Sequence, residues 1–150
     1  MYAKILVPVD GSHTANQALD EAIKLAKALG STIEVLHVVD NSHLLYDAGL
    51  SAAAGVHDSV VDAGQTILEQ ARSRIASAGL RSEIRLVEEP VALGDIPGAI
   101  LKAAKDSKAE LVVIGSHGRT GFRKLVLGSV AEKVMHQCPL PVWIIRGKET

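Results

Sequence analysis

The chain has 150 residues, of which 47% are hydrophobic, 22% are charged and 3% are aromatic, and its formal net charge is −1. This length fits one domain, residues 1–150, with an aliphatic core, and the apolar content argues against disorder. The balanced charge excludes the strongly basic domain that is typical of nucleic-acid-binding proteins.

The first part of the chain predicts a strand, a helix and a second strand. Residues 5–9 are a short, largely β-branched run, which is typical of a buried strand. Apolar residues then recur at helical spacing over residues 15–29, and Gly30 follows as a C-terminal cap. Residues 32–39 predict the second strand.

Residues 41–57 have no clear period and contain two glycines and a run of small residues. They predict a long surface loop with at most a helical turn. Loops of this length are uncommon in compact domains unless they are functional or disordered. A helix is expected next, over residues 58–78.

The rest of the chain continues the alternation of strands and helices. Asp95 is expected to accept backbone N–H groups as the N-cap of a helix that has Pro97 in its first turn. A helix is also expected over residues 129–137. Strands are predicted over residues 82–87, 111–114 and 141–146.

Strands that alternate with helices predict an α/β fold, with an open parallel sheet covered by helices on both faces in a Rossmann-like, doubly wound arrangement. Such sheets bind ligands beyond the carboxyl ends of the strands, where the strand order reverses. If the first and fourth strands are neighbours, Asp10 and Gly115 face one crevice.

The single cysteine, Cys138, excludes an internal disulfide and is typical of a reducing compartment. No run reaches the roughly 18 apolar residues that span a bilayer, and residues 1–10 lack the features of a secretory signal. We therefore expect a cytoplasmic protein with no membrane partner.

The segment from Gly115 to Ser129 carries the main functional signal. It runs from the end of the fourth strand to the first turn of the fourth helix. Glycines allow close backbone approach, and a helix N-terminus offers N–H groups and partial positive charge to a phosphate. Neither the G-x-G-x-x-G fingerprint nor the G-K-[ST] of a P-loop is present, so physics alone predicts only an anion site.

The glycine spacing resembles the ATP-binding branch of the universal stress protein family. Gly115 is followed after two residues by Gly118, after nine more by Gly128, and then by Ser129. The stretches KILVPVDGS, VVIGSHGRTG, LGSVAEKV and CPLPVWIIR also look like that family, so the resemblance covers the whole chain. It implies a five-stranded sheet in the order 3-2-1-4-5 and, usually, a homodimer.

The resemblance also implies the binding residues. The adenine role falls on Pro8, Asp10 and Val38, and the ribose and phosphate role falls on Ile114, Gly115, Gly118, Gly128, Ser129 and Val130. Arg119 belongs to a basic run that could partly neutralise the phosphates. The implied cofactor is ATP, with Mg²⁺ or Mn²⁺ held mainly by the phosphates.

Each of these residues also has a plainer interpretation. Asp10 could cap the turn after the first strand, and Ser129 could cap the fourth helix. The glycines could serve turn geometry alone, and the basic run could be a solvated face. The histidines show no metal-ligand spacing and no catalytic triad stands out, so no metal site and no catalytic residue are predicted.

The final strand is expected at an edge of the sheet, and exposed edges invite pairing. The resemblance implies antiparallel pairing of the last strands of two subunits, with Val142 and Ile144 as candidate contacts and Trp143 on the opposite face. The alternative is a monomer whose edge is guarded by Arg146 and Lys148.

Together these patterns predict an ATP-binding stress-response or signalling module that passes its bound state to an unknown protein partner through the loop over residues 41–57. Hydrolysis is expected to be slow or absent, because the P-loop lysine and an obvious general base are missing. A weak ATPase or phosphotransferase stays open. A sensor of AMP or of a cyclic adenine nucleotide also stays open, because the segment from Gly115 to Ser129 does not encode the number of phosphates.

Overall fold

Nine helices and strands alternate in the computed structural model, which describes residues 1–40, 50–88, 95–117 and 127–147. In chain order they are β1 (Lys4–Pro8), α1 (His13–Leu29), β2 (Thr32–Val38), α2 (Leu50–Ser77), β3 (Ser82–Val87), α3 (Ile96–Asp106), β4 (Leu111–Gly115), α4 (Ser129–Gln137) and β5 (Val142–Ile145). Their order and type confirm the sequence-based expectation. The bounds differ by at most two residues, except at the start of α2.

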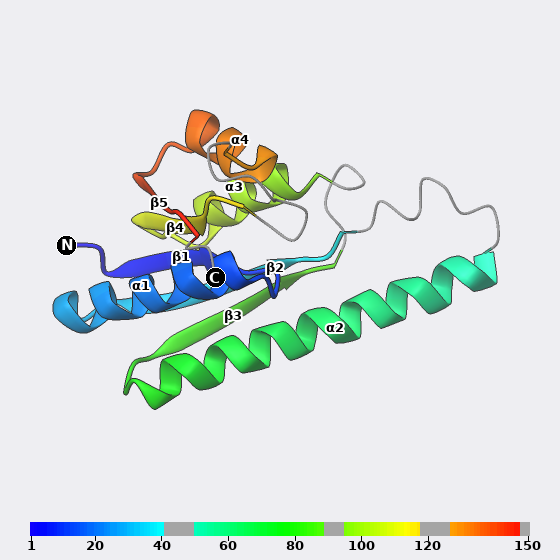
Figure 1. The fold of residues 1–150 in the computed structure, drawn as a ribbon, viewed down its shortest axis with the longest axis horizontal. Coiled ribbons are helices and arrows are strands. Elements are labelled where there is room, and N and C mark those ends of the chain that lie inside the picture. Colours follow the sequence, from blue (N-terminus) through cyan, green and yellow to red (C-terminus); the bar gives the residue numbers. More distant parts are fainter. Residues whose placement is uncertain (41–49, 89–94, 118–126, 148–150) are drawn as a thin grey trace.

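The five strands form one parallel sheet in the order β3-β2-β1-β4-β5 (Figure 1), which confirms the expected order. The central strand, β1, pairs with a different strand on each side: Ile5 lies opposite Ile33 of β2 and opposite Leu111 of β4. The chain moves outward from β1 to β3 and then returns to the other side of β1. The strand order therefore reverses between β1 and β4.

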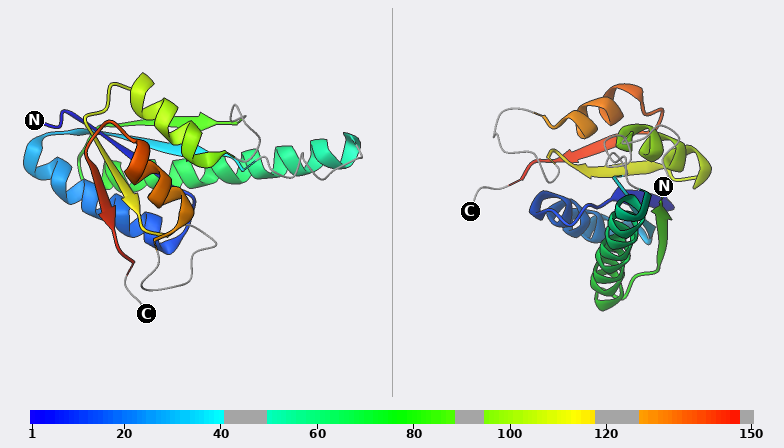
Figure 2. Two further views of the ribbon diagram at one scale, coloured as in Figure 1. Left: turned by 90° about the horizontal axis from the view of Figure 1, so that it is seen from above. Right: turned by 90° about the vertical axis from the view of Figure 1, so that its right-hand side faces the viewer.

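Helices cover both faces of the sheet, with α1 and α2 on one face and α3 and α4 on the other (Figure 2). Successive residues of β1 point to opposite faces: Ile5 and Val7 lie in the core cluster under α1 and α2, and Leu6 lies in the cluster under α3 and α4. This burial on two faces explains why the central strands are continuous aliphatic runs.

The prediction of a long loop over residues 41–57 is wrong for residues 50–57, because α2 begins at Leu50. Residues 41–49 lie outside the described residues. The segment after Leu50 is rich in alanine, which has the highest helix propensity, but it has no apolar stripe for a periodicity reading to detect. With 28 residues, α2 extends past the end of the sheet (Figure 1). Neither α2 nor any other described helix is long and apolar enough to cross a membrane.

A cluster of charges lies on the α3 and α4 side of the sheet, across β1, β2 and β3. The Glu34 side chain is 4% exposed and lies 2.9 Å from Arg85 Nε and 3.7 Å from Lys4 Nζ. Lys4 Nζ also lies 2.6 Å from a carboxylate oxygen of Glu83. This hydrogen bond lowers the pKa of Glu83 and raises the pKa of Lys4.

Glu83→Gln should lower the free energy of unfolding at neutral pH by no more than about 1 kcal/mol, because the Glu83 side chain is 52% exposed and solvent screens the pair. The folded pKa of Glu83 lies below its unfolded value of about 4.3. Its contribution is therefore complete above about pH 5 and is lost as the pH falls through the folded pKa.

Denaturant unfolding of the wild type, Glu83→Gln, Lys4→Met and the double variant gives the coupling energy of the pair. The coupling should be present at about pH 7 and absent at about pH 2. An equal coupling energy at both pH values would contradict this assignment.

Candidate functional site

A cleft of about 590 Å³ opens at the carboxyl ends of the strands. It lies at the reversal of strand order and is lined by Asp10, which follows β1, and by Gly115, the last residue of β4. This confirms that the two residues face one crevice. The volume is within the range of about 300–1,000 Å³ that is usual for small-molecule sites.

The structure brings together every predicted binding residue that it describes. The predicted binding residues that line the cleft are Pro8, Asp10, Val38, Ile114, Gly115, Gly128, Ser129 and Val130. The other two, Gly118 and Arg119, lie outside the described residues. Contact between any of these residues and a nucleotide stays a prediction.

The cleft also has aliphatic walls that the sequence did not assign to a site. On one side they are Val60, Ala63 and Ile67 of α2, and on the other they are Ile96 and Ile100 of α3. These residues belong to the apolar stripes of their helices. Helical periodicity cannot separate a stripe residue over the middle of a sheet from one at its end.

The start of α4 differs from the starts of α1 and α3. Ser12 Oγ accepts a hydrogen bond from Ala15 N at 3.2 Å in α1, and Asp95 accepts one from Gly98 N at 3.0 Å in α3, which confirms Asp95 as an N-cap. In α4 the N-cap is Gly128, and no side chain caps the helix. The first N–H groups of α4 therefore have no intrahelical partner and no side-chain partner among the described residues, and they border the cleft.

Two of the plainer interpretations describe real contacts. Asp10 Oδ1 accepts a hydrogen bond from Ser12 N at 2.9 Å, so Asp10 does cap the turn after β1. A Cβ at Gly115 would lie 2.8 Å from Thr14 Cγ2, and a Cβ at Gly128 would lie 2.8 Å from Ser116 O. Close backbone packing therefore favours both glycines whether or not a ligand binds.

His37 lines the cleft from β2 and is 8% exposed. Its Nδ1 lies 2.8 Å from the carbonyl oxygen of Val9, and because a carbonyl only accepts, Nδ1 carries a proton. A Cβ at Gly64 of α2 would lie 2.6 Å from His37 Cδ2, so the ring packs tightly on that helix. His37 thus joins the ends of β1 and β2 to α2, a role that no sequence pattern indicated.

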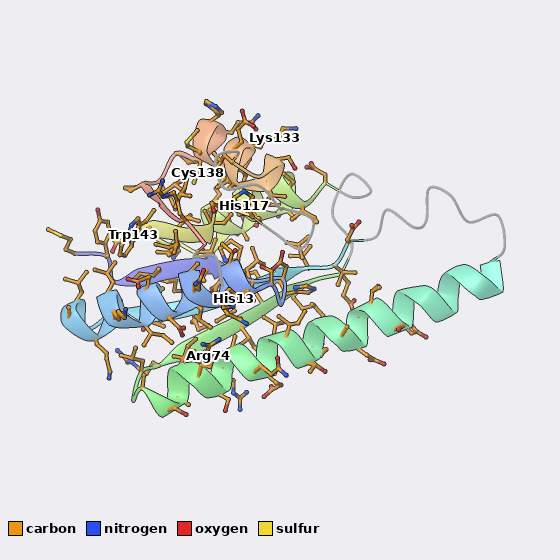
Figure 3. The ribbon with its side chains drawn as sticks, in the orientation of Figure 1. His13, Arg74, His117, Lys133, Cys138 and Trp143 are labelled. Atoms are coloured by element: carbon orange, nitrogen blue, oxygen red, sulfur yellow. The ribbon has the colours of Figure 1, made fainter. Side chains whose placement is uncertain are left out.

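His117 lines the cleft just after β4. Its Nδ1 lies 3.0 Å from Ser116 Oγ, and its Nε2 is buried without a hydrogen-bond partner in the part of the chain that the structure describes. Figure 3 shows His117 on the α4 side of the sheet and His13 at α1 on the other side.

The described lining of the cleft carries negative charge. It includes the carboxylates of Asp10, Asp40 and Glu132, and no lysine or arginine is among the lining residues that the structure describes. The basic run that includes Arg119 lies outside the described residues. Within the described ranges, no three His, Cys, Asp or Glu side chains are grouped so that they could hold a metal ion.

Comparison with known proteins gives one consistent result. The model of the universal stress protein family matches residues 1–146. Universal stress protein YxiE of Bacillus subtilis is 32% identical over 154 positions, covering 97% of this chain and 100% of YxiE.

Solved structures agree with the sequence relatives. The structure of MJ0577, a universal stress protein of Methanocaldococcus jannaschii, matches with a TM-score of 0.87 and 25% identity, over 100% of this chain and 99% of that one. The universal stress protein of Archaeoglobus fulgidus in complex with dAMP matches with a TM-score of 0.70 and 27% identity, over 96% and 98% of the two chains.

Ser12→Ala and Ser129→Ala should affect stability differently, although both serines stand at a helix start. Loss of the Ser12 cap should lower the free energy of unfolding by about 1 kcal/mol. Loss of the Ser129 hydroxyl, which makes no cap, should change it by less than about 0.5 kcal/mol. Denaturant unfolding measures both, and equal losses would contradict the difference in capping.

Proposed function

Because this chain belongs to the universal stress protein family, we propose that it binds an adenine nucleotide, with ATP as the leading candidate, in the cleft between β1 and β4. The uncapped start of α4 is the observation that supports this most directly. Its N–H groups and the positive end of the helix dipole border the cleft and suit a phosphate.

The lining offers each part of a nucleotide a suitable surface. Pro8 and Val38 supply apolar surface for the adenine at the ends of β1 and β2, with Asp10 beside them. The phosphates would lie toward Gly115 and the first turn of α4, where Ser129 is exposed. Gly118 and Arg119, in the segment from Gly115 to Ser129, complete the proposed set of binding residues.

The carboxylates in the lining favour a nucleotide that carries a divalent cation. Asp10, Asp40 and Glu132 would repel bare phosphates, and Mg²⁺ or Mn²⁺ on the phosphates would reduce that repulsion. The proposal therefore includes the cation as part of the ligand, held mainly by the phosphates and not by a site of its own.

The proposed role is that of a cytoplasmic stress-response or signalling module that binds ATP with slow or no hydrolysis. Fast phosphoryl transfer needs dense electrostatic positioning of the phosphates, and the sequence has neither a P-loop lysine nor an obvious general base. A protein partner would read the bound state if that partner distinguished two conformations of the module.

A sensor of adenosine monophosphates is the second candidate. It is favoured by the similarity to the Archaeoglobus fulgidus protein that was solved with dAMP. The two candidates differ in the number of phosphates that the start of α4 receives, so direct comparison of ATP with AMP separates them.

We also propose that the protein forms a homodimer through β5, which is an edge strand of the sheet. The carbonyl of Pro141 accepts a hydrogen bond from Val112 N of β4 at 3.0 Å, and that of Ile145 accepts one at 2.8 Å from Ser116 N, directly after β4. Because strand residues alternate, the N–H and C=O groups of Val142 and Ile144 point away from β4. A second copy of β5 could pair with them.

The side chains of these two residues have another role. Val142 and Ile144 pack against the core cluster under α3 and α4, whereas Trp143 on the opposite face is 40% exposed. The proposed contact of Val142 and Ile144 is therefore made by their backbone, and Trp143 is the exposed side chain beside it.

Isothermal titration of the wild type with ATP, ADP and AMP, with and without Mg²⁺, tests the nucleotide proposal. We expect the tightest binding for ATP with Mg²⁺ and an affinity at least about 5-fold weaker for Ser129→Ala, because one hydroxyl hydrogen bond to a charged phosphate is lost. Tighter binding of AMP would favour the second candidate. Absence of heat at millimolar ATP, together with an unchanged melting temperature, would remove the proposal.

Ile144→Pro should convert the proposed dimer into a monomer, because proline removes an N–H that points out of the sheet and leaves the bonds between β4 and β5 in place. Ile144→Ala removes the same core side chain but keeps the N–H, so it should stay dimeric. Sedimentation equilibrium gives the mass of each variant. A wild type that is monomeric, or a proline variant that stays dimeric, would contradict pairing through β5.

A further inference from the structure

The His117 side chain has a buried polar atom without a partner among the described residues. His117 is one of the residues that line the cleft. Its Nε2 atom is buried and makes no hydrogen bond within the described ranges. The large majority of buried side-chain polar atoms have a partner, so each exception calls for an explanation. A group on a bound ligand would supply the missing partner here.

The backbone around His117 is held in place beside the start of α4. Ser116 N donates to Ile145 O at 2.8 Å, and Ser116 O accepts from Gly128 N at 2.7 Å. A Cβ at Gly128 would lie 3.3 Å from His117 Cα, so His117 packs directly against the N-cap of α4. The Cα of His117, from which the imidazole extends, is therefore held next to the first N–H groups of that helix.

The other ring nitrogen decides what Nε2 can do. Nδ1 lies 3.0 Å from the hydroxyl oxygen of Ser116, a residue that is 3% exposed. When this hydroxyl donates to Nδ1, the neutral ring carries its proton on Nε2. The opposite arrangement makes Nε2 an acceptor, which suits a ligand N–H or O–H and not a phosphate.

We propose that Nε2 of His117 donates a hydrogen bond to a phosphate oxygen of the bound nucleotide, and that Ser116 keeps the proton on Nε2 by donating to Nδ1. This inference rests on the proposed function and adds a side-chain donor to the backbone donors of α4. The phosphate site then has donors on two sides: the helix N-terminus and the imidazole of His117.

Three substitutions separate a phosphate contact from a structural role. Glutamine can place an amide N–H near the position of Nε2, asparagine reaches only as far as Nδ1, and leucine has no donor. His117→Leu and His117→Asn should bind ATP about 10-fold or more weakly, and His117→Gln should stay within about 3-fold of the wild type. Adenosine, which has no phosphate, should bind all four proteins alike.

Isothermal titration with ATP and with adenosine measures these affinities, and thermal unfolding without ligand confirms that each variant is folded. If His117→Leu does not fold, the comparison of glutamine with asparagine gives the same test. His136→Gln is the matched control, because His136 is an exposed histidine of α4 outside the cleft lining. It should bind ATP as the wild type does.

Two results would overturn the inference while leaving the proposed function intact: ATP affinity equal in the wild type and His117→Leu, or an equal loss of affinity for ATP and for adenosine. The second result would assign Nε2 to the nucleoside as an acceptor. A wild type that binds neither ATP nor adenosine would instead remove the proposed function, and this inference with it.

Discussion

The cleft depends on the way in which the chain leaves the central strands. The three inner strands are covered on both faces, so a ligand has no room along the sheet. The helix that follows β1, α1, packs on one face of the sheet, whereas the helix that follows β4, α4, packs on the other. The cleft lies at the ends of β1 and β4 between these two helices, where the reversal of strand order favours a binding site.

The starts of the helices then give the cleft its chemical character. Capping by Ser12 and Asp95 satisfies N–H groups at the starts of α1 and α3, whereas the N-cap of α4 is Gly128, which has no side chain to cap the helix. Burial of Ala131 and Val134 holds α4 against the sheet instead. A helix that is stabilised by packing can leave its first N–H groups open to a ligand. The Nε2 of His117, which has no partner among the described residues, lies in the same part of the molecule.

The candidate site shows how far sequence reasoning reaches. The crevice shared by Asp10 and Gly115 followed from strand order alone, because parallel strands end at one edge of the sheet. A ligand-binding role for the glycines could not be predicted from strand order. Gly115 and Gly128 are also favoured by close packing, because a side chain at either position would collide with its neighbours. His37 was passed over, because its importance comes from Val9 and Gly64, which are far from it in the sequence.

The sequence by itself determined the class of fold, the alternation of strands and helices and most of their bounds, because apolar spacing and end caps are local properties. It missed the first eight residues of α2, where alanine propensity acts without an apolar stripe. Only the tertiary structure decided which apolar helix residues line the cleft, which serine caps its helix and which imidazole nitrogen is buried without a partner in the described part of the chain. These depend on distances between segments that are remote in the chain, and only the packing of the helices on the sheet establishes those distances.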